Sequence, residues 1–392
     1  CTMPKRNQSE LALAKLLNSY AEANDAKAAL IFGWHFALFL VSFTFAIIPE
    51  SLLLRVLCAT LAGIQISALF VIAHDCAHGS FFKKKAVNDI IGRLAMLPAL
   101  HNFTMWRVVH NQWHHATPNV RGLNSWSPMS PAEFRAAPSW RRLLERFYRT
   151  LAGFPFYYMI ERWLSYKLLP GPSIPRSLRP RAWRDFLVIL VFLIAWLTTC
   201  ASLGAASGRT VAASIGLGFA VPHLLWSLLM AKTVYLQHTS PVIPWFAHEQ
   251  AFAEQAGQQD VTMYVRMPRW YGFISNEIME HTAHHIHPRV PLYNLRSAQQ
   301  ELDNQLGARL IQSTLSPATF LRTLQVCKLY DYDHHCWCDF RGRVTARVPV
   351  DDTLATESEA DIDVPSSALR TVSLAFRRTA GSEYRCVTDA FE

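Results

Sequence analysis

Four long apolar stretches dominate the pattern of hydrophobic and polar positions along the chain. They cover approximately residues 31–48, 52–73, 186–203 and 211–231. About 20 helical residues cross the roughly 30 Å hydrocarbon core of a bilayer, so each stretch is long enough to span a membrane. Short polar turns at 49–51 and 204–210 separate the members of each pair. The pattern therefore predicts an all-α integral membrane protein with four transmembrane helices in two hairpins.

The other segments are less apolar. Residues 90–105 and 151–164 mix apolar side chains with Trp, Tyr and Arg, which is typical of interfacial helices. Residues 247–329 are polar and favour cytosolic helices. We therefore expect three parts, namely an N-terminal cytosolic segment (1–30), a membrane domain (31–340) and a disordered, Ser/Thr- and acid-rich C-terminal tail (341–392).

Composition supports a membrane protein over a pair of soluble domains. Apolar residues make up 51% of the 392 residues and charged residues 17%, against roughly 25% charged in soluble proteins. The net charge of +9 does not indicate nucleic-acid binding, because the basic residues cluster beside the apolar stretches. Seventeen Lys/Arg against five Asp/Glu lie between Gly79 and Asp185. The positive-inside tendency then places this connection and both termini in the cytoplasm.

Eight of the 16 histidines fall into three clusters. The first, His74-Asp75-Cys76-Ala77-His78, directly follows the second apolar stretch, and residues four apart share a face of a helix. The second and third clusters contain His110, His114 and His115, and His281, His284 and His285. The spacing of the third predicts that its histidines share one helix face. All three clusters fall on one predicted side of the membrane, which indicates a common metal site.

Eight imidazoles are more than one ion uses, because zinc sites take three or four protein ligands. The number suits two metal ions, and imidazole binds Fe, Cu, Ni and Zn. Iron is the expected metal if the task is to activate dioxygen against an alkyl C–H bond. The zinc-protease pattern His-Glu-x-x-His is absent, as are the paired Glu-x-x-His motifs of soluble di-iron bundles. Asp75 is a candidate partner for the second nitrogen of a ligand histidine, or else a local cap.

At these clusters the sequence resembles the membrane fatty acid desaturases, most closely their omega-6 (delta-12) acyl-lipid branch from plastids and bacteria. The resemblance lies in HDCAHGSFFKKKAVNDIIGRLAMLP (74–98), WRVVHNQWHHATPN (106–119), QHTSPVIPWF (237–246) and HTAHHIHPRVPLYNLRSAQQEL (281–302). It covers roughly residues 30–340 in order and spacing. It implies a di-iron site beneath a cap of cytosolic helices, reached by a narrow apolar tunnel, with His238 as a ninth ligand.

The second cluster departs from the pattern of this branch. The usual spacing is His-x-x-His-His, whereas here His110 stands one residue further from His114. Histidines at i, i+4 and i+5 of an α-helix spread over a wider arc. We therefore expect His110 to bind from a distorted turn, with His101 as the alternative.

The resemblance implies oxygen-dependent introduction of a double bond into the acyl chain of a membrane lipid, at the delta-12/omega-6 position. A related di-iron hydroxylase, epoxygenase or ketolase would carry the same clusters, and a membrane metal-binding or transport protein is a further alternative. The chain shows no dinucleotide, haem or iron–sulfur motif. Electrons must therefore come from a donor such as ferredoxin or cytochrome b5. The branch favours a bacterial inner membrane with the active site on the cytoplasmic face.

Two features are open at the level of sequence. The segment His334-His335-Cys336-Trp337-Cys338 is either a small zinc site or, as its aromatic neighbours favour, part of a packed core. The position of the double bond and the lipid carrier do not follow from any motif, because they depend on how the substrate is placed at the metals.

Overall fold

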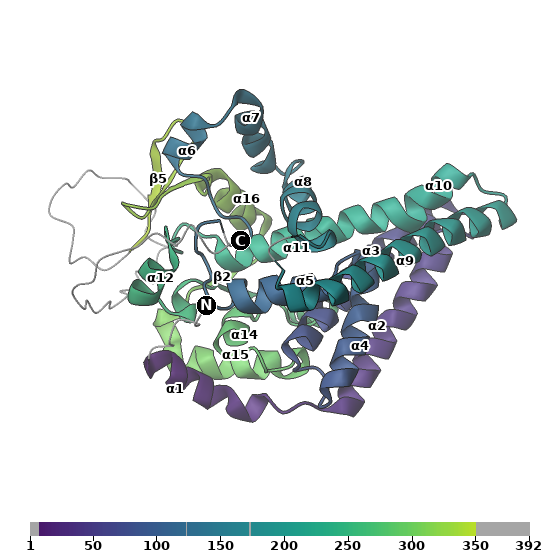
Figure 1. Cartoon of the computed structure of the whole chain (residues 1–392), viewed down its shortest axis with the longest axis horizontal. Coiled ribbons are helices and arrows are strands. Elements are labelled where there is room, and N and C mark those ends of the chain that lie inside the picture. The colour runs from purple at the N-terminus through teal and green to yellow at the C-terminus, as the bar shows by residue number, and fades with distance from the viewer. Residues whose placement is uncertain (1–7, 123, 172–173, 350–392) are drawn as a thin grey trace.

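The computed structural model describes residues 8–122, 124–171 and 174–349 of the chain, and most of them lie in helices (Figure 1). Four helices are long and apolar enough to span a membrane, namely Asp25–Phe45, Leu52–His78, Arg176–Ala206 and Val211–His238. They are formed by α2 (Asp25–Phe45), α3 (Leu52–His78), η5 (Arg176–Leu178) with α9 (Arg179–Ala206), and α10 (Val211–Ile215), η6 (Gly216–Ala220) and α11 (Val221–His238). These helices match the four predicted stretches.

Helix α3 is at the centre of this part of the fold, packed against α2 and α11. The Ser51 hydroxyl caps its start by accepting from the backbone N–H of Leu54. Its end is longer than the apolar stretch predicted, because the helix continues through His78 and stops only at Gly79, which adopts a left-handed conformation with φ of 69°. The first histidine cluster therefore forms the last turn of a membrane-spanning helix.

A close approach between α3 and α11 depends on Gly63. A Cβ at this position would lie 2.8 Å from the backbone oxygen of Pro222 and 3.0 Å from Cβ of Leu225. Real Cβ contacts of this length are strongly repulsive, so only glycine lets the two helices come this near. Both helices carry histidines at their ends, and their spacing thus sets the distance between two parts of the site.

The long connection between α3 and α9 contains short helices. They are α4 (Lys85–Met96), η2 (Leu97–Ala99), α5 (Phe103–Val108), η3 (Val109–His114), α6 (Pro131–Ala136), α7 (Ser139–Tyr148), α8 (Phe154–Tyr157) and η4 (Tyr158–Leu168). Two of them, η3 and η4, are π-helices. The segments expected at the membrane interface correspond to α4, η2 and α5, and to α8 and η4, where Ile90 and Ile160 are exposed.

The region after α11 packs at the histidine-bearing end of the four spans (Figure 1). Its helices are α12 (Glu249–Gln255), η7 (Gln258–Asp260), α13 (Arg269–Ile274), α14 (His281–Ile286), α15 (Leu292–Leu306), η8 (Gly307–Arg309) and α16 (Pro317–Val326). The N-terminal α1 (Gln8–Leu16) and η1 (Leu17–Tyr20) join it, because Leu13 and Leu17 pack against Ile286 and Leu295. The N-terminal helices thus share one small core with α14 and α15.

The expectation of an entirely α-helical fold needs one correction. Five short strands are present, namely β1 (Tyr264–Arg266), β2 (Gln312–Thr314), β3 (Leu329–Asp331), β4 (Cys336–Cys338) and β5 (Val344–Arg347). Strands β1 and β2 pair in parallel, and β3, β4 and β5 form an antiparallel sheet. The domain boundary expected at residue 340 falls inside this sheet, so the folded region extends through β5. The remainder of the tail, 350–392, lies outside the described residues.

The contact at Gly63 yields a prediction about stability. Replacement by Val should force α3 and α11 apart and cost about 1–3 kcal/mol, the usual range for overpacking. A lower melting temperature in detergent would report this loss of stability. The control is Gly33→Ala in α2, where an added Cβ meets nothing within 4 Å. An unchanged melting temperature for Gly63→Val would show that the helices separate without cost.

Candidate metal centre

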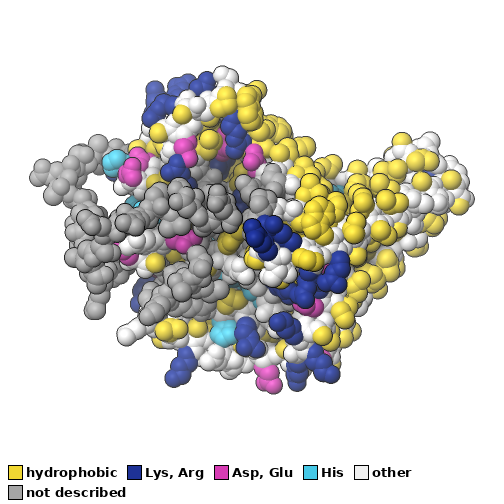
Figure 2. All heavy atoms as spheres, in the orientation of Figure 1, with side chains coloured by type: hydrophobic (Ala, Val, Ile, Leu, Met, Phe, Trp, Pro, Cys, Tyr) yellow, Lys and Arg dark blue, Asp and Glu magenta, His cyan; other side chains and the backbone are white. Residues whose placement is uncertain are grey.

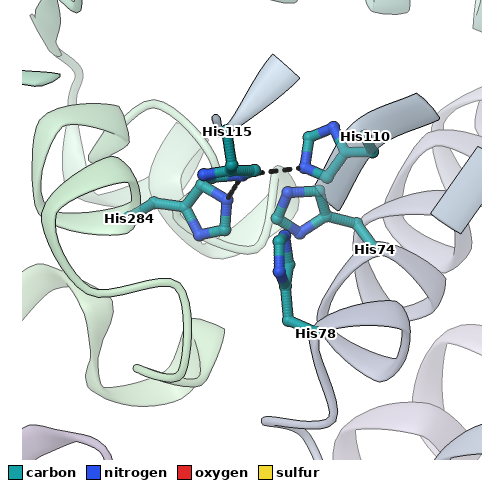
Figure 3. Close-up of side chains that lie close together, drawn as sticks. All are labelled: His74, His78, His110, His115 and His284. Atoms are coloured by element: carbon teal, nitrogen blue, oxygen red, sulfur yellow. Dashed lines mark hydrogen bonds between the residues drawn. The ribbon is translucent and has the colours of Figure 1, made fainter. Parts of the chain in front are cut away.

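Nine histidines from four separate parts of the chain converge into two groups. The first group contains His74, His78, His110, His115 and His284, and the second contains His114, His238, His281 and His285. Within each group, one nitrogen of every ring lies within 4.8 Å of the others. Figure 3 shows the first group, with rings from α3, the second cluster and α14 turned toward a common centre. All nine histidines predicted as ligands are therefore brought together by the fold.

The unusual spacing of the second cluster is accommodated by the π-helix η3. A π-turn bonds residues five apart, and the backbone N–H of His115 donates to the carbonyl of His110 at 3.0 Å. His110 and His115 consequently face the same group, with their Nε2 atoms 3.0 Å apart. His101, the alternative considered from the sequence, contacts the carbonyl of Ala99 and the hydroxyl of Tyr158 and lies outside both groups.

Neighbouring histidines in the second and third clusters point to different groups. His114 and His115 separate in this way, as do His284 and His285. His281, His284 and His285 occupy positions i, i+3 and i+4 of α14, which lie on one side of a helix. Because consecutive positions lie about 100° apart, His284 points to the first group while His281 and His285 point to the second. Each His-His pair thus contributes to both groups.

The spacing of the nitrogens within each group is that of metal ligands. The Nε2 atoms of His115 and His284 are 3.0 Å apart, and those of His238 and His281 are 2.8 Å apart. Two imidazole nitrogens that bind one ion at about 2.1 Å, at right angles, would be separated by about 3.0 Å. The contacts therefore have the length expected for edges of a coordination polyhedron.

Oxygen atoms hold the second ring nitrogen of four of these histidines. The Nδ1–H of His74 donates to Asp75 at 2.9 Å, and that of His238 donates to the carbonyl of Val261 at 3.1 Å. Asp75 thus lies where a partner of a ligand histidine was expected, and its other oxygen accepts from the backbone N–H of Leu292. Such contacts set the tautomer and leave Nε2 with its lone pair for a metal.

Gln258 and Asn124 hold the Nδ1 atoms of two histidines in the second group. The Nδ1–H of His285 donates to Oε1 of Gln258 at 2.8 Å, and that of His114 donates to Oδ1 of Asn124 at 2.8 Å. Both amides have a fixed orientation, because their NH₂ groups donate to the carbonyls of His115 and Thr117. Sequence reasoning missed both residues, since no motif marks an amide that contacts a histidine distant in sequence.

These hydrogen bonds indicate that the histidines fit a bound cation. With Nδ1 protonated, the Nε2 atoms of His114 and His285 carry lone pairs, yet they face each other at 3.2 Å. Two lone pairs repel at that distance unless a positive charge lies between them. Nε2 of His74 and of His78 are buried and have no hydrogen-bond partner among the described residues. Orphaned, converging nitrogens of this kind are rare in proteins unless an ion satisfies them.

The histidines outside the spans are held neutral. Burial lowers the pKa of His110, His115, His281, His284 and His285 well below the ordinary value, and the surrounding imidazoles lower each pKa further. A neutral imidazole is the form that binds a metal, so no proton has to be displaced near neutral pH.

A pocket that opens to solvent is lined by residues of both groups. His74 and His110 of the first group line it, as do His114 and His281 of the second. The remainder of the lining includes Phe70, Val71, Trp106, Val109, Met230, Val234 and Ile278. A largely apolar cavity that also exposes metal-binding side chains suits an apolar substrate whose reaction takes place at the metals.

The segment His334–Cys338 does not join either group. The ring of His334 is exposed and contacts Asp331, while Cys336 and Cys338 pack against Phe134 and Leu329. Of the two interpretations left open by the sequence, these contacts favour the packed core.

Comparison with known proteins relates the chain to fatty acid desaturases. The family model for fatty acid desaturases matches residues 50–313, more than half of the chain. The chain is 28% identical over 277 residues to a chloroplastic omega-6 fatty acid desaturase of Glycine max, covering 70% of this chain and 62% of the relative. It is 30% identical over 279 residues to the sn-1 oleoyl-lipid 12-desaturase of Synechocystis sp., covering 69% and 75%.

A third relative is the sn-1 acyl-lipid omega-3 desaturase (ferredoxin) of Nostoc sp., at 30% identity over 252 residues, covering 62% of this chain and 66% of the relative. The chain spans about three fifths of the length of the Glycine max relative. The matched residues of the family model contain all nine histidines and three of the four spans. The chain is thus a membrane protein and belongs to the fatty acid desaturase family.

Proposed function

We propose that this protein is an acyl-lipid desaturase that introduces a double bond at the delta-12/omega-6 position of a fatty acyl chain in a membrane lipid. The observation that carries the proposal is the pair of histidine groups lining a largely apolar cavity, at the edge of the membrane-spanning helices. The printed names of the Glycine max and Synechocystis relatives supply the position on the chain.

Family membership and the imidazole groups support iron as the metal. We propose two irons, one held by His74, His78, His110, His115 and His284 and the other by His114, His238, His281 and His285. Bound there, iron would supply the activation of dioxygen that removal of hydrogen from an unactivated alkyl chain requires.

The residues of the chain itself bind the substrate and orient the ligands. Apolar side chains of α3 and α11, such as Phe70 and Met230, would hold the acyl chain and exclude water. Trp106 stacks on His110 with ring centroids 4.2 Å apart and fixes that ring. Asp75, Asn124 and Gln258 orient histidines through Nδ1. Positioning alone would then decide which two carbons face the metals.

The reaction needs electrons from outside the chain. Two hydrogens leave adjacent methylenes, and together with two electrons from a donor and two protons from solvent they reduce one dioxygen to two waters. We propose a small electron carrier, ferredoxin or cytochrome b5, as the donor. The basic charge of the chain would suit an acidic partner, and the Nostoc relative is named for ferredoxin.

The proposed topology places the chemistry in the cytoplasm. The spans would form two hairpins within a membrane domain beginning near residue 31, after an N-terminal cytosolic segment, and the helices after α11 would cap the metals. The excess of Lys/Arg between Gly79 and Asp185 supports a cytoplasmic location for that side. By analogy with the bacterial relatives, we propose the inner membrane of a bacterium as the location.

Lipid profiling tests the reaction directly. Expression in a host rich in oleoyl lipids should yield linoleoyl chains, because the cavity would place the delta-12 carbons at the metals. Gas chromatography of the fatty acid methyl esters measures the product. Hydroxylated, epoxidised or ketone-bearing chains would instead indicate one of the related oxidative reactions, and a double bond elsewhere would refute the assigned position.

Removal of one ligand from each proposed site tests the metal assignment. His284→Ala and His114→Ala should each abolish desaturation and reduce iron from roughly two ions per chain, since each deletes one imidazole from a different group. Mass spectrometry of the metal content and membrane fractionation measure both effects. His334→Ala is the control, because its side chain is 75% exposed and outside both groups. Full activity in either variant would remove that residue from the ligand set.

The contact between Gln258 and His285 gives a further prediction. Gln258→Ala should weaken metal binding about 10–100-fold, the usual effect of losing a partner of a ligand histidine. Iron retained during dialysis against a graded chelator measures it. Gln259→Ala is the matched control, because that neighbouring amide donates to Asp260 and has no hydrogen bond to a histidine among the described residues. Equal retention by the two variants would contradict a positioning role for Gln258.

A further inference from the structure

The outward face of α7 is apolar. Trp140 is 67% exposed, Leu143 70% and Phe147 40%. These residues are three and four positions apart, so they form one stripe along the helix. A surface helix of a soluble protein presents polar side chains on its outward face and apolar ones to the core. Helix α7 does the opposite.

Contacts on the inward face explain why α7 keeps its apolar side chains exposed. Glu145 and Arg149 are both buried and form an ion pair at 2.9 Å, and Tyr148 is fully buried beside them. Breaking a buried pair of this kind costs several kcal/mol, about 3–5 when one partner is removed. The exposed position of the apolar stripe is therefore a fixed property of the fold.

The apolar stripe continues onto α8 and η4. The rings of Phe147 and Phe156 lie 5.8 Å apart, and Phe156, Ile160 and Leu164 follow at intervals of four residues with 39%, 41% and 46% exposure. We call these six residues, Trp140 through Leu164, the α7–η4 surface. Contiguous exposed apolar side chains on this scale mark an interaction surface, whereas single ones do not.

Two observations identify the partner as a lipid bilayer. Figure 2 shows apolar side chains running from α7 and α8 toward those that cover the membrane-spanning helices α9 and α10. Basic residues border the stripe, with Arg135 and Arg146 exposed on one side and Arg141 joined to Glu161 of η4 at 3.0 Å. Apolar and aromatic residues bordered by arginine are typical of helices lying in the headgroup region of a membrane.

We propose that the α7–η4 surface is seated in one leaflet of the bilayer, as a membrane contact beside the four spans. The same helix η4 turns Tyr158 and Arg162 toward the cavity that reaches the histidines. Only one helix therefore separates the lipid leaflet from the cavity on this side. Seating α7 and η4 in the leaflet sets the depth at which the cavity wall meets the lipid.

Photo-cross-linking of the full chain in lipid nanodiscs tests the proposal without requiring activity. Leu143→p-benzoylphenylalanine should form adducts with phospholipid on irradiation, detected by mass spectrometry of the peptide. The same substitution at Leu187, exposed on the membrane-spanning α9, is the positive reference. At Asn304, exposed on α15 at the opposite end of the molecule, it is the negative control. The yield at Leu143 should exceed that at Asn304 at least about tenfold.

Phe147→p-benzoylphenylalanine provides a second position on the same surface in case the first substitution perturbs folding. Lipid adducts at either position support the proposal. A cross-link to a second copy of the chain would show instead that the surface joins two protomers, and yields equal to that of Asn304 at both positions would show contact with water. Either result would overturn the proposal, and neither depends on which reaction the protein catalyses.

Discussion

Nine histidines whose ring nitrogens converge in two groups are the constraint on which the remainder of the structure depends. The Nε2 atoms of His114 and His285 lie 3.2 Å apart while their Nδ1 atoms are committed to amide oxygens. Such an arrangement is unfavourable for the protein alone and becomes favourable with a cation at its centre. The fold must therefore supply rigid supports that hold the rings in place against their mutual repulsion.

Those supports come from segments that are far apart in the sequence. Helix α3 carries the first cluster beyond the apolar stretch, and Gly63 lets it approach α11, which ends at His238. The third cluster is on α14, anchored by α15 and by Leu13 and Leu17 of the N-terminal helices. The two histidine groups thus lie between the long apolar helices and the helices that follow α11.

The π-helix η3 shows how local backbone geometry serves the site. With an α-helical repeat, an extra residue in the second cluster would rotate His110 away from His115. The wider π-turn absorbs that residue and directs both rings to one group. A π-helix also forms η4, between the proposed lipid-facing surface and the cavity. In both places the irregular helix lies where the reaction is proposed to occur.

The sequence alone determined the features that depend on neighbouring residues. Four apolar stretches were visible because membrane spans require about 20 consecutive apolar residues. The clusters around His74, His110 and His281 were visible because their members lie within a few residues of one another, and the motifs around them pointed to the desaturase family. Even the partner of His74 could be proposed, since Asp75 is adjacent.

Only the tertiary structure decided how these parts combine. The division of the histidines into two groups separates His284 from His285, and it depends on how α14 is oriented against α3 and α11. Gln258 and Asn124 could not be identified as supports, because each meets its histidine through a fold that brings distant segments together. The short strands near the C-terminus and the outward apolar face of α7 were missed for the same reason. Periodicity shows that a helix has an apolar face, but the buried pair of Glu145 and Arg149 decides which way that face points.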